Sequence, residues 1–209
     1  VGMVLLLSMG EIDLSVASTL TLVNVVTAIL LREAVPMPVA VLLGLTCGAA
    51  CGFVNGMLSV LLAIPTIIIT LGTMSVYRGL ALVVSNATPI GGFSKPSILF
   101  EMGSGQIGGI PTSVLLMIVV GAAGYVLLNH TAFGWRVQAT GSSPEAARFS
   151  GIPLARYRVI AMTIMGTVAG LAGIMELAFL QSGSPTTGQG YELYVIAAAI
   201  IGGTPLSGG

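Results

Sequence analysis

Charged residues are scarce in this chain. Lys and Arg number 7, Asp and Glu number 7, and together they make up 7% of the 209 residues, whereas a soluble domain carries about 25%. The formal net charge is zero and basic residues cluster in only one loop, so nucleic acid is not expected as a partner. With 55% apolar residues and a mean hydropathy of +1.04, the composition predicts one membrane domain instead.

Groups that carry catalysis or bind metals are also rare. The single His, His130, ends an apolar run and has no acid near it in the sequence. Cys47 and Cys51 lie inside another apolar run, without extramembrane Cys or His residues that would build a disulfide framework or a zinc site. A glycine-rich phosphate loop followed by Lys is absent as well. We therefore expect no catalytic residues, no metal and no cofactor in this chain.

Long apolar runs, in contrast, fill most of the sequence. A helix needs about 20 apolar residues to cross a hydrocarbon core about 30 Å thick. The runs close to or above that length are 16–31, 37–54, 57–84, 112–128 and 159–180. Pro65 divides the longest one, which predicts a short half-helix, a break and then a full span. Runs 1–9 and 195–201 are too short to cross alone, so we interpret them as the tail of a span and as half of a broken or re-entrant helix.

These runs predict an all-α fold, a polytopic transmembrane helical bundle in which residues 1–209 form a single domain. The chain opens without Met, inside an apolar run, and ends in the glycine-rich stretch 202–209. We expect it to be a fragment that lacks helices at its N- and C-terminal ends.

The distribution of arginines predicts the orientation of the bundle. Four of the seven basic residues lie in segment 131–158, namely Arg136, Arg148, Arg156 and Arg158, and the only acid there is Glu145. By the positive-inside rule this segment is a cytoplasmic loop. Counting spans from it, segments 85–110 and 181–190 and the pair at 32–33 lie outside, and residues 11–13 lie near the inner face.

Within this loop the sequence specifies a short helix. Ser143 is suited to the N-cap, Pro144 to the first helical position, Glu145 to the positive end of the helix dipole, and Gly151 to the stop. A helix of two turns is marginal alone, so it must rest on something. A partner protein and the protein's own bundle are both open at this point.

A few polar residues lie within the apolar runs. Asp13 and Glu176 are costly there and suggest a solute path, although Asp13, like Glu11 beside it, could instead mark a membrane edge and Glu176 could reach the surface. Thr70 and Thr73 follow Thr66 on one side of the helix after Pro65, where they could bind a polar solute or merely satisfy neighbouring helices.

Two further features concern the helices themselves. We expect Arg78, late in a span, to extend outward to the surface, with a substrate contact as the less favoured alternative. Glycines recur every fourth residue at Gly44, Gly48, Gly52 and Gly56, which predicts a helix stripe that another backbone approaches closely.

The loop helix carries a motif that resembles a known family. Glu145-Ala146-Ala147, with Gly151 four residues later, is similar to the EAA coupling motif of the membrane permeases of bacterial ABC importers. Further motifs follow in the order of the ribose-type permease family, which also serves xylose, arabinose, galactose and autoinducer-2. They are Gly10-Glu-Ile-Asp-Leu-Ser15, Ile64-Pro65, Thr70-Leu-Gly-Thr73, Arg78-Gly79, Ala169-Gly-Leu-Ala-Gly-Ile174 with Glu176, Gly188-Gln-Gly-Tyr-Glu-Leu193 and the stretch 201–209. Glu11 departs from the pattern, since family members often have Gly or another small or polar residue there.

The resemblance implies a subunit of the bacterial inner membrane that moves a sugar or sugar-like solute by alternating access. Its partners would be a second permease copy or paralogue, two cytoplasmic ATPase subunits that hold ATP-Mg, an extracytoplasmic solute-binding protein, and membrane lipid. Coupling to the ATPase would involve Glu145, Ala146, Ala147, Arg148 and Gly151, and the solute path Asp13, Thr70, Thr73 and Glu176. A secondary transporter or channel that works without ATPase subunits is the alternative.

Overall fold

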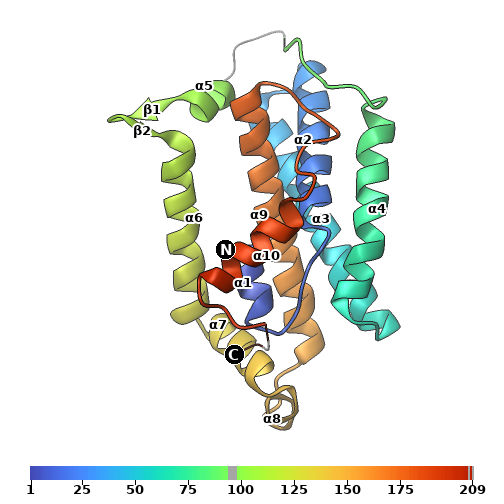
Figure 1. Cartoon of the computed structure of the whole chain (residues 1–209), viewed down its shortest axis with the longest axis vertical. Coiled ribbons are helices and arrows are strands. Elements are labelled where there is room, and N and C mark those ends of the chain that lie inside the picture. The colour runs from blue at the N-terminus through green and yellow to red at the C-terminus, as the bar shows by residue number, and fades with distance from the viewer. Residues whose placement is uncertain (94–97, 207, 209) are drawn as a thin grey trace.

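The computed structural model describes residues 1–93, 98–206 and 208, and it is built almost entirely of helices. Four helices in this described part are long and apolar enough to cross a membrane: α3 (Met37–Leu62), α4 (Thr66–Val84), α6 (Thr112–Asn129) and α9 (Leu154–Leu180). They run side by side along the long axis of the molecule (Figure 1). The predicted all-α transmembrane bundle is confirmed.

Three shorter helices complete the bundle. They are α1 (Gly2–Leu7), α2 (Val16–Arg32) and α10 (Tyr191–Ile201). Helix α2 is largely buried and packs against α3, α4 and α9. Its buried side chains include several polar ones, namely Ser18, Thr19, Thr21, Asn24 and Thr27. Helix α2 therefore brings several hydroxyl and amide groups into the interior of the bundle.

The two ends of the bundle differ in their connections. One end carries α7 (Ala132–Ser142) and α8 (Pro144–Phe149). The opposite end carries α5 (Ile98–Ser104) and the hairpin of β1 (Gln106–Ile107) and β2 (Ile110–Pro111) (Figure 1). The long loop after α9 joins this second end through a bridge between Ile90 and Gly183. The arginine-rich segment and segments 85–110 and 181–190 thus lie at opposite ends, in the order that the span count predicts.

The predicted half-helix before Pro65 is wrong. Helix α3 continues without interruption from Met37 to Leu62, so residues 57–62 belong to the preceding span. The chain breaks at Ala63, which takes the left-handed conformation (φ 53°), and α4 begins after Pro65. Asn55 and Gly56, which read as an interruption in the sequence, are buried within α3 because neighbouring helices contact them closely.

Two predicted loops contain more structure than their composition suggested. The segment before Ser143 forms α7, whose N-cap Thr131 accepts a hydrogen bond from the backbone N–H of Gly134. Segment 85–110 contains α5 and the start of the hairpin, and its residues 94–97 lie outside the described part. Helix α9 also begins at Leu154, before the apolar run itself, with Pro153 at its N-cap.

Helices α3 and α9 approach each other closely along glycines. A Cβ at Gly48 would lie 2.5 Å from the carbonyl oxygen of Gly166, and one at Gly56 would lie 2.8 Å from the Cα of Val159. At Gly52 it would meet the carbonyl group of Met162. At Gly44 the nearest atom belongs to Thr27 of α2, so the stripe serves two neighbours. Small residues allow helices to pack at this distance in a membrane.

Candidate functional site

Helix α8 is held in shape by its own residues. The Ser143 hydroxyl accepts a hydrogen bond of 3.3 Å from the N–H of Ala146, and Pro144 occupies the first helical position. The helix ends at Phe149, and the chain turns away at Gly151, whose φ of 79° suits glycine. The N–H of Ile152 donates to the carbonyl of Ala147 over 3.0 Å. The two-turn helix expected after Ser143 is present, with both ends capped.

Only one residue of α8 is buried. Ala147 is 4% exposed and lies against the bundle, whereas Glu145, Ala146 and Arg148 are exposed. Phe149 is 85% exposed, among the highest fractions of any large apolar side chain in the described chain. A small hollow is lined by Pro144, Glu145, Arg148 and Phe149. The helix thus rests on its own bundle through one alanine and leaves an apolar and charged surface uncovered.

Helices α7 and α9, which flank α8 in the chain, contact each other directly. Arg136 of α7 donates a 2.6 Å hydrogen bond to the hydroxyl of Tyr157 of α9, and the Phe133 ring lies 5.6 Å from the ring of Tyr157. Val137 of α7 is fully buried in the same cluster. Because short connections join α8 to both helices, these contacts between α7 and α9 fix the position of α8 relative to the bundle.

An extended segment joins α1 to α2 and carries Asp13. This side chain is 1% exposed, and its Oδ1 accepts hydrogen bonds from the N–H of Ser15 at 2.7 Å and from the Ser15 hydroxyl at 2.6 Å. The amide of Asn55 in α3 donates to the same hydroxyl over 2.8 Å. Asp13 therefore sits at the start of a buried polar network.

The network continues across α3 and α4. The hydroxyl of Tyr77 lies 3.0 Å from both Oδ1 of Asn55 and the carbonyl oxygen of Cys51, and these two acceptors share its single proton. The N–H of Leu14 donates to the hydroxyl of Thr70 over 3.1 Å. Sequence reasoning missed Asn55 and Tyr77, although an Asn in the middle of an apolar run was a usable signal.

The three threonines of α4 do not lie equivalently. Thr66 and Thr70 are buried and contact the extended segment. Thr73 is half-buried and its hydroxyl points to the carbonyl of Thr70, at 3.4 Å, in its own helix. The Thr73 hydroxyl thus bonds within its own helix, whereas the other two threonines connect α4 to the chain between α1 and α2.

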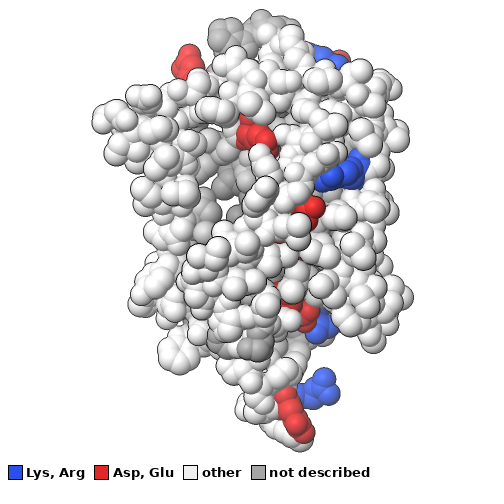
Figure 2. Space-filling view, viewed as in Figure 1, with Lys and Arg blue, Asp and Glu red and all other residues white. Residues whose placement is uncertain are grey.

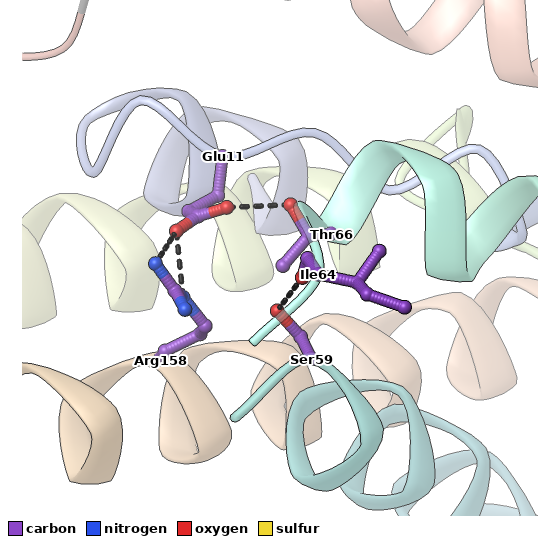
Figure 3. A network of polar contacts seen from close by, with 5 residues as sticks. All are labelled: Glu11, Ser59, Ile64, Thr66 and Arg158. Carbon is purple, nitrogen blue, oxygen red and sulfur yellow. Dashed lines mark hydrogen bonds and ion pairs between the residues drawn. The ribbon is translucent and has the colours of Figure 1, made fainter. Parts of the chain in front are cut away.

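A second polar junction lies nearer to α8. Arg158 of α9 binds Oε1 of Glu11 through Nη2 at 2.6 Å and through Nε at 2.7 Å (Figure 3). The other carboxylate oxygen of Glu11 accepts a hydrogen bond of 2.5 Å from the Thr66 hydroxyl. Close by, the Ser59 hydroxyl donates to the carbonyl of Ile64 over 2.8 Å and holds the break between α3 and α4.

Glu176 lies at the opposite end of the bundle. It is half-buried, and its Oε1 accepts a 2.6 Å hydrogen bond from the hydroxyl of Thr187 in the loop after α9. The same loop is held by Thr21 and Asn24 of α2, which bind the carbonyl of Thr187 and the N–H of Ser184. Glu176 therefore takes part in fixing the loop that leads into α10.

The sequence matches a known family of transport proteins. The family model of the branched-chain amino acid transport system permease component matches residues 1–208. The chain belongs to this permease family. No solved structure gives a significant match.

Individual relatives are similar over the whole chain. The ribose import permease protein RbsC of Escherichia coli (strain K12) is 40% identical over 100% of this chain and 66% of its own length. The L-arabinose transport system permease protein AraH of the same strain is 37% identical, over 100% of this chain and 63% of its own. The D-allose transport system permease protein AlsC, from the same strain, is 37% identical over 98% of this chain and 65% of its own length. The chain thus spans just under two thirds of the length of these relatives.

The surface of this permease chain agrees with a multi-pass protein of the inner membrane. Helix α6 has no buried residue and exposes large apolar side chains such as Met117, Ile118 and Val119. In Figure 2 the flank formed by α6 is uncharged, and the charged groups gather along the middle of the face and at its ends. Lipid suits the apolar flank.

Two charged residues of the permease chain have unpartnered buried atoms. Nε and Nη2 of Arg78 in α4, and Oε2 of Glu192 in the first turn of α10, are buried without a hydrogen-bond partner among the described residues. The Arg78 residue as a whole is only half-buried, so its extension to the surface stays a prediction. Burial of a charged group without a partner is costly, so these atoms are candidates for contact with a polar ligand.

Proposed function

We propose that this chain is the membrane-spanning part of an ABC importer permease, which moves a sugar or sugar-like solute by alternating access. ATP hydrolysis would take place in partner subunits, because segment 1–209 contains no phosphate-binding loop of its own. The further partners in this proposal are a second permease copy or paralogue and an extracytoplasmic binding protein.

The observation that carries the proposal is the uncovered surface of α8. The helix is capped at both ends, so Glu145, Arg148 and Phe149 are displayed in a fixed arrangement at one end of the bundle. An exposed aromatic residue beside charged ones is typical of a protein interface. A cytoplasmic ATPase fits this surface, because arginines in the same segment put it on the cytoplasmic side.

The polar interior supports a solute path through the bundle. Asp13 of the extended segment, Asn55 of α3 and Thr70 of α4 are all buried between the helices. Glu176 and Thr73 would extend this path toward the end opposite α8. Polar residues within a membrane domain are costly and often mark a solute pathway.

A polyhydroxyl solute suits the groups that are left unpartnered. Arg78 offers two donor nitrogens with three N–H groups and Glu192 one acceptor oxygen, and sugar hydroxyls can both donate and accept hydrogen bonds. Ribose, L-arabinose and D-allose appear in the names of the relatives, so these three sugars are the first to test.

A secondary transporter would not need the surface of α8. Broken helices and intramembrane acids are expected of such transporters as well. The break between α1 and α2, with the buried Asp13 in it, meets that expectation here. The displayed coupling helix and the membership in a family of transport-system permease components favour the ABC importer.

Co-purification with the ATPase subunit tests the proposal. The full-length permease is expressed with its ATPase subunit, and Glu145→Arg is compared with Arg32→Ala at the opposite end. We expect Glu145→Arg to abolish co-purification while the permease remains folded, and Arg32→Ala to preserve it. Equal co-purification of both variants would rule out docking through α8.

A further inference from the structure

The junction at Glu11 connects three parts of the chain that are far apart in sequence. Arg158 binds one oxygen of the Glu11 carboxylate at 2.6 Å and 2.7 Å, and Thr66 binds the other at 2.5 Å (Figure 3). The Glu11 side chain is 14% exposed and the Arg158 side chain 34% exposed. Both oxygens of the carboxylate are therefore occupied at a site with limited access to water.

Arg158 connects the junction to α8. It lies in the second turn of α9, and only residues 150–153 separate α9 from α8. Its neighbour Tyr157 is bound by Arg136 of α7 over 2.6 Å. A displacement of α8 that moves the first two turns of α9 must therefore move the guanidinium of Arg158 as well.

Glu11 and Thr66 connect the junction to the polar interior. Glu11 begins the extended segment in which Asp13 and Leu14 bind Ser15 and Thr70. Thr66 is the first residue of α4, directly after the break at residues 63–65. The extended segment lacks helical hydrogen bonds of its own, so side-chain contacts at its ends set its position.

We infer that Glu11 and Arg158 are positioning residues for transport, which carry the displacement of α8 to the extended segment and to the start of α4. Neither residue needs to contact solute or ATPase for this role. The inference rests on the proposed function, since it assigns the route by which a movement at α8 reaches the interior.

The ion pair suits this role better than an apolar contact does. Two hydrogen bonds from one guanidinium to a carboxylate fix direction as well as distance, and removal of one partner leaves the other charge poorly solvated. The Arg32–Glu33 pair provides a comparison, because its atoms lie 3.6 Å apart and its side chains are 48% and 66% exposed. Such an exposed pair contributes little.

The first test measures solute moved per ATP hydrolysed. The full-length permease, its ATPase and its binding protein are reconstituted in liposomes with radiolabelled D-ribose, L-arabinose or D-allose. We expect Glu11→Gln and Arg158→Ala to lower this ratio about fivefold or more while ATPase co-purification persists. The reversed pair, Glu11→Arg with Arg158→Glu, should regain at least half of the ratio, and Glu33→Gln should leave it unchanged.

A second test does not depend on what is transported. Leu14→Cys is introduced into permease in which Cys47 and Cys51 are replaced by Ala, and its rate of maleimide labelling is measured by mass spectrometry. We expect Glu11→Gln to change that rate about fivefold or more, and the reversed pair to restore it.

The two tests separate the failure of the inference from that of the proposed function. Uptake that needs no ATP in the unmodified transporter would overturn the proposed function, whatever the labelling shows. Unchanged labelling at residue 14 in Glu11→Gln would overturn the inference, as would a normal ratio of solute to ATP in both single variants. Failure of the reversed pair to restore either quantity in an assembled complex would also overturn it.

Discussion

Replacing Phe149 by Ala is predicted to weaken the binding of the ATPase subunit strongly. Phe149 is 85% exposed at the end of α8, and its neighbours Glu145 and Arg148 are exposed as well. A cleft in a partner that closes over α8 would remove most of this ring from water. Because aromatic side chains at the centre of an interface often dominate its affinity, Phe149 is the residue of α8 expected to contribute most.

The size of the effect follows from the area of the ring. Full burial of a Phe side chain is worth about 1.5 to 3 kcal/mol, and little of that has been gained in the isolated chain. Loss of about 1.5 to 3 kcal/mol corresponds to a decrease in affinity of about 10- to 150-fold. Truncation should not disturb α8 itself, because the hydrogen bonds at both ends of the helix use other residues.

Titration of the purified ATPase onto full-length permease in nanodiscs measures this change. Phe179→Ala is the matched control, since Phe179 is also exposed, at 63%, but lies at the opposite end of α9. We expect the affinity of Phe179→Ala to equal that of the unmodified permease. Wild-type affinity for Phe149→Ala, in a variant with an unchanged melting temperature, would refute docking through this surface.

Three further predictions concern the bundle. Gly52→Leu should destabilise the bundle by about 1 to 3 kcal/mol or more, because the new side chain meets the backbone of Met162. Gly72→Leu, at an open site on α4, is the control. A lower Tm for Gly52→Leu than for Gly72→Leu would show the effect, and equal Tm values would contradict it. Asn55→Leu should cost about 1 to 3 kcal/mol in thermal unfolding, because Ser15 and Tyr77 lose a buried partner, whereas Thr46→Leu, on the exposed side of the same helix, should cost little. Glu176→Gln should slow sugar uptake while ATPase co-purification persists, and unchanged uptake would remove Glu176 from the path.

The spans and the short helix were predictable because their signals are local. Apolar length defines a membrane helix, and the residues that cap α8 lie within ten positions of one another. The glycine spacing in α3 likewise reports on one helix face, although it does not say which neighbour packs there. That neighbour is mainly α9, more than 100 residues later in the chain.

The polar contacts of the interior were not predictable, because their partners are distant in sequence. Glu11 is bound by Arg158, 147 positions away, and no local pattern links the two. The end of α3 was misplaced for a related reason. Asn55 suggests a break when read alone, but inside α3 it bonds Ser15 and Tyr77, so the helix continues to Leu62.

Uptake of radiolabelled sugar by liposomes that contain the full-length permease and its binding protein, with and without the ATPase subunit, tests the central claim most directly. D-ribose, L-arabinose and D-allose are supplied in parallel, with ATP on the ATPase side. The account predicts that at least one sugar accumulates only when both ATPase and ATP are present, and that Glu145→Arg abolishes this accumulation. Accumulation at the same rate without the ATPase would contradict the account and favour a secondary transporter.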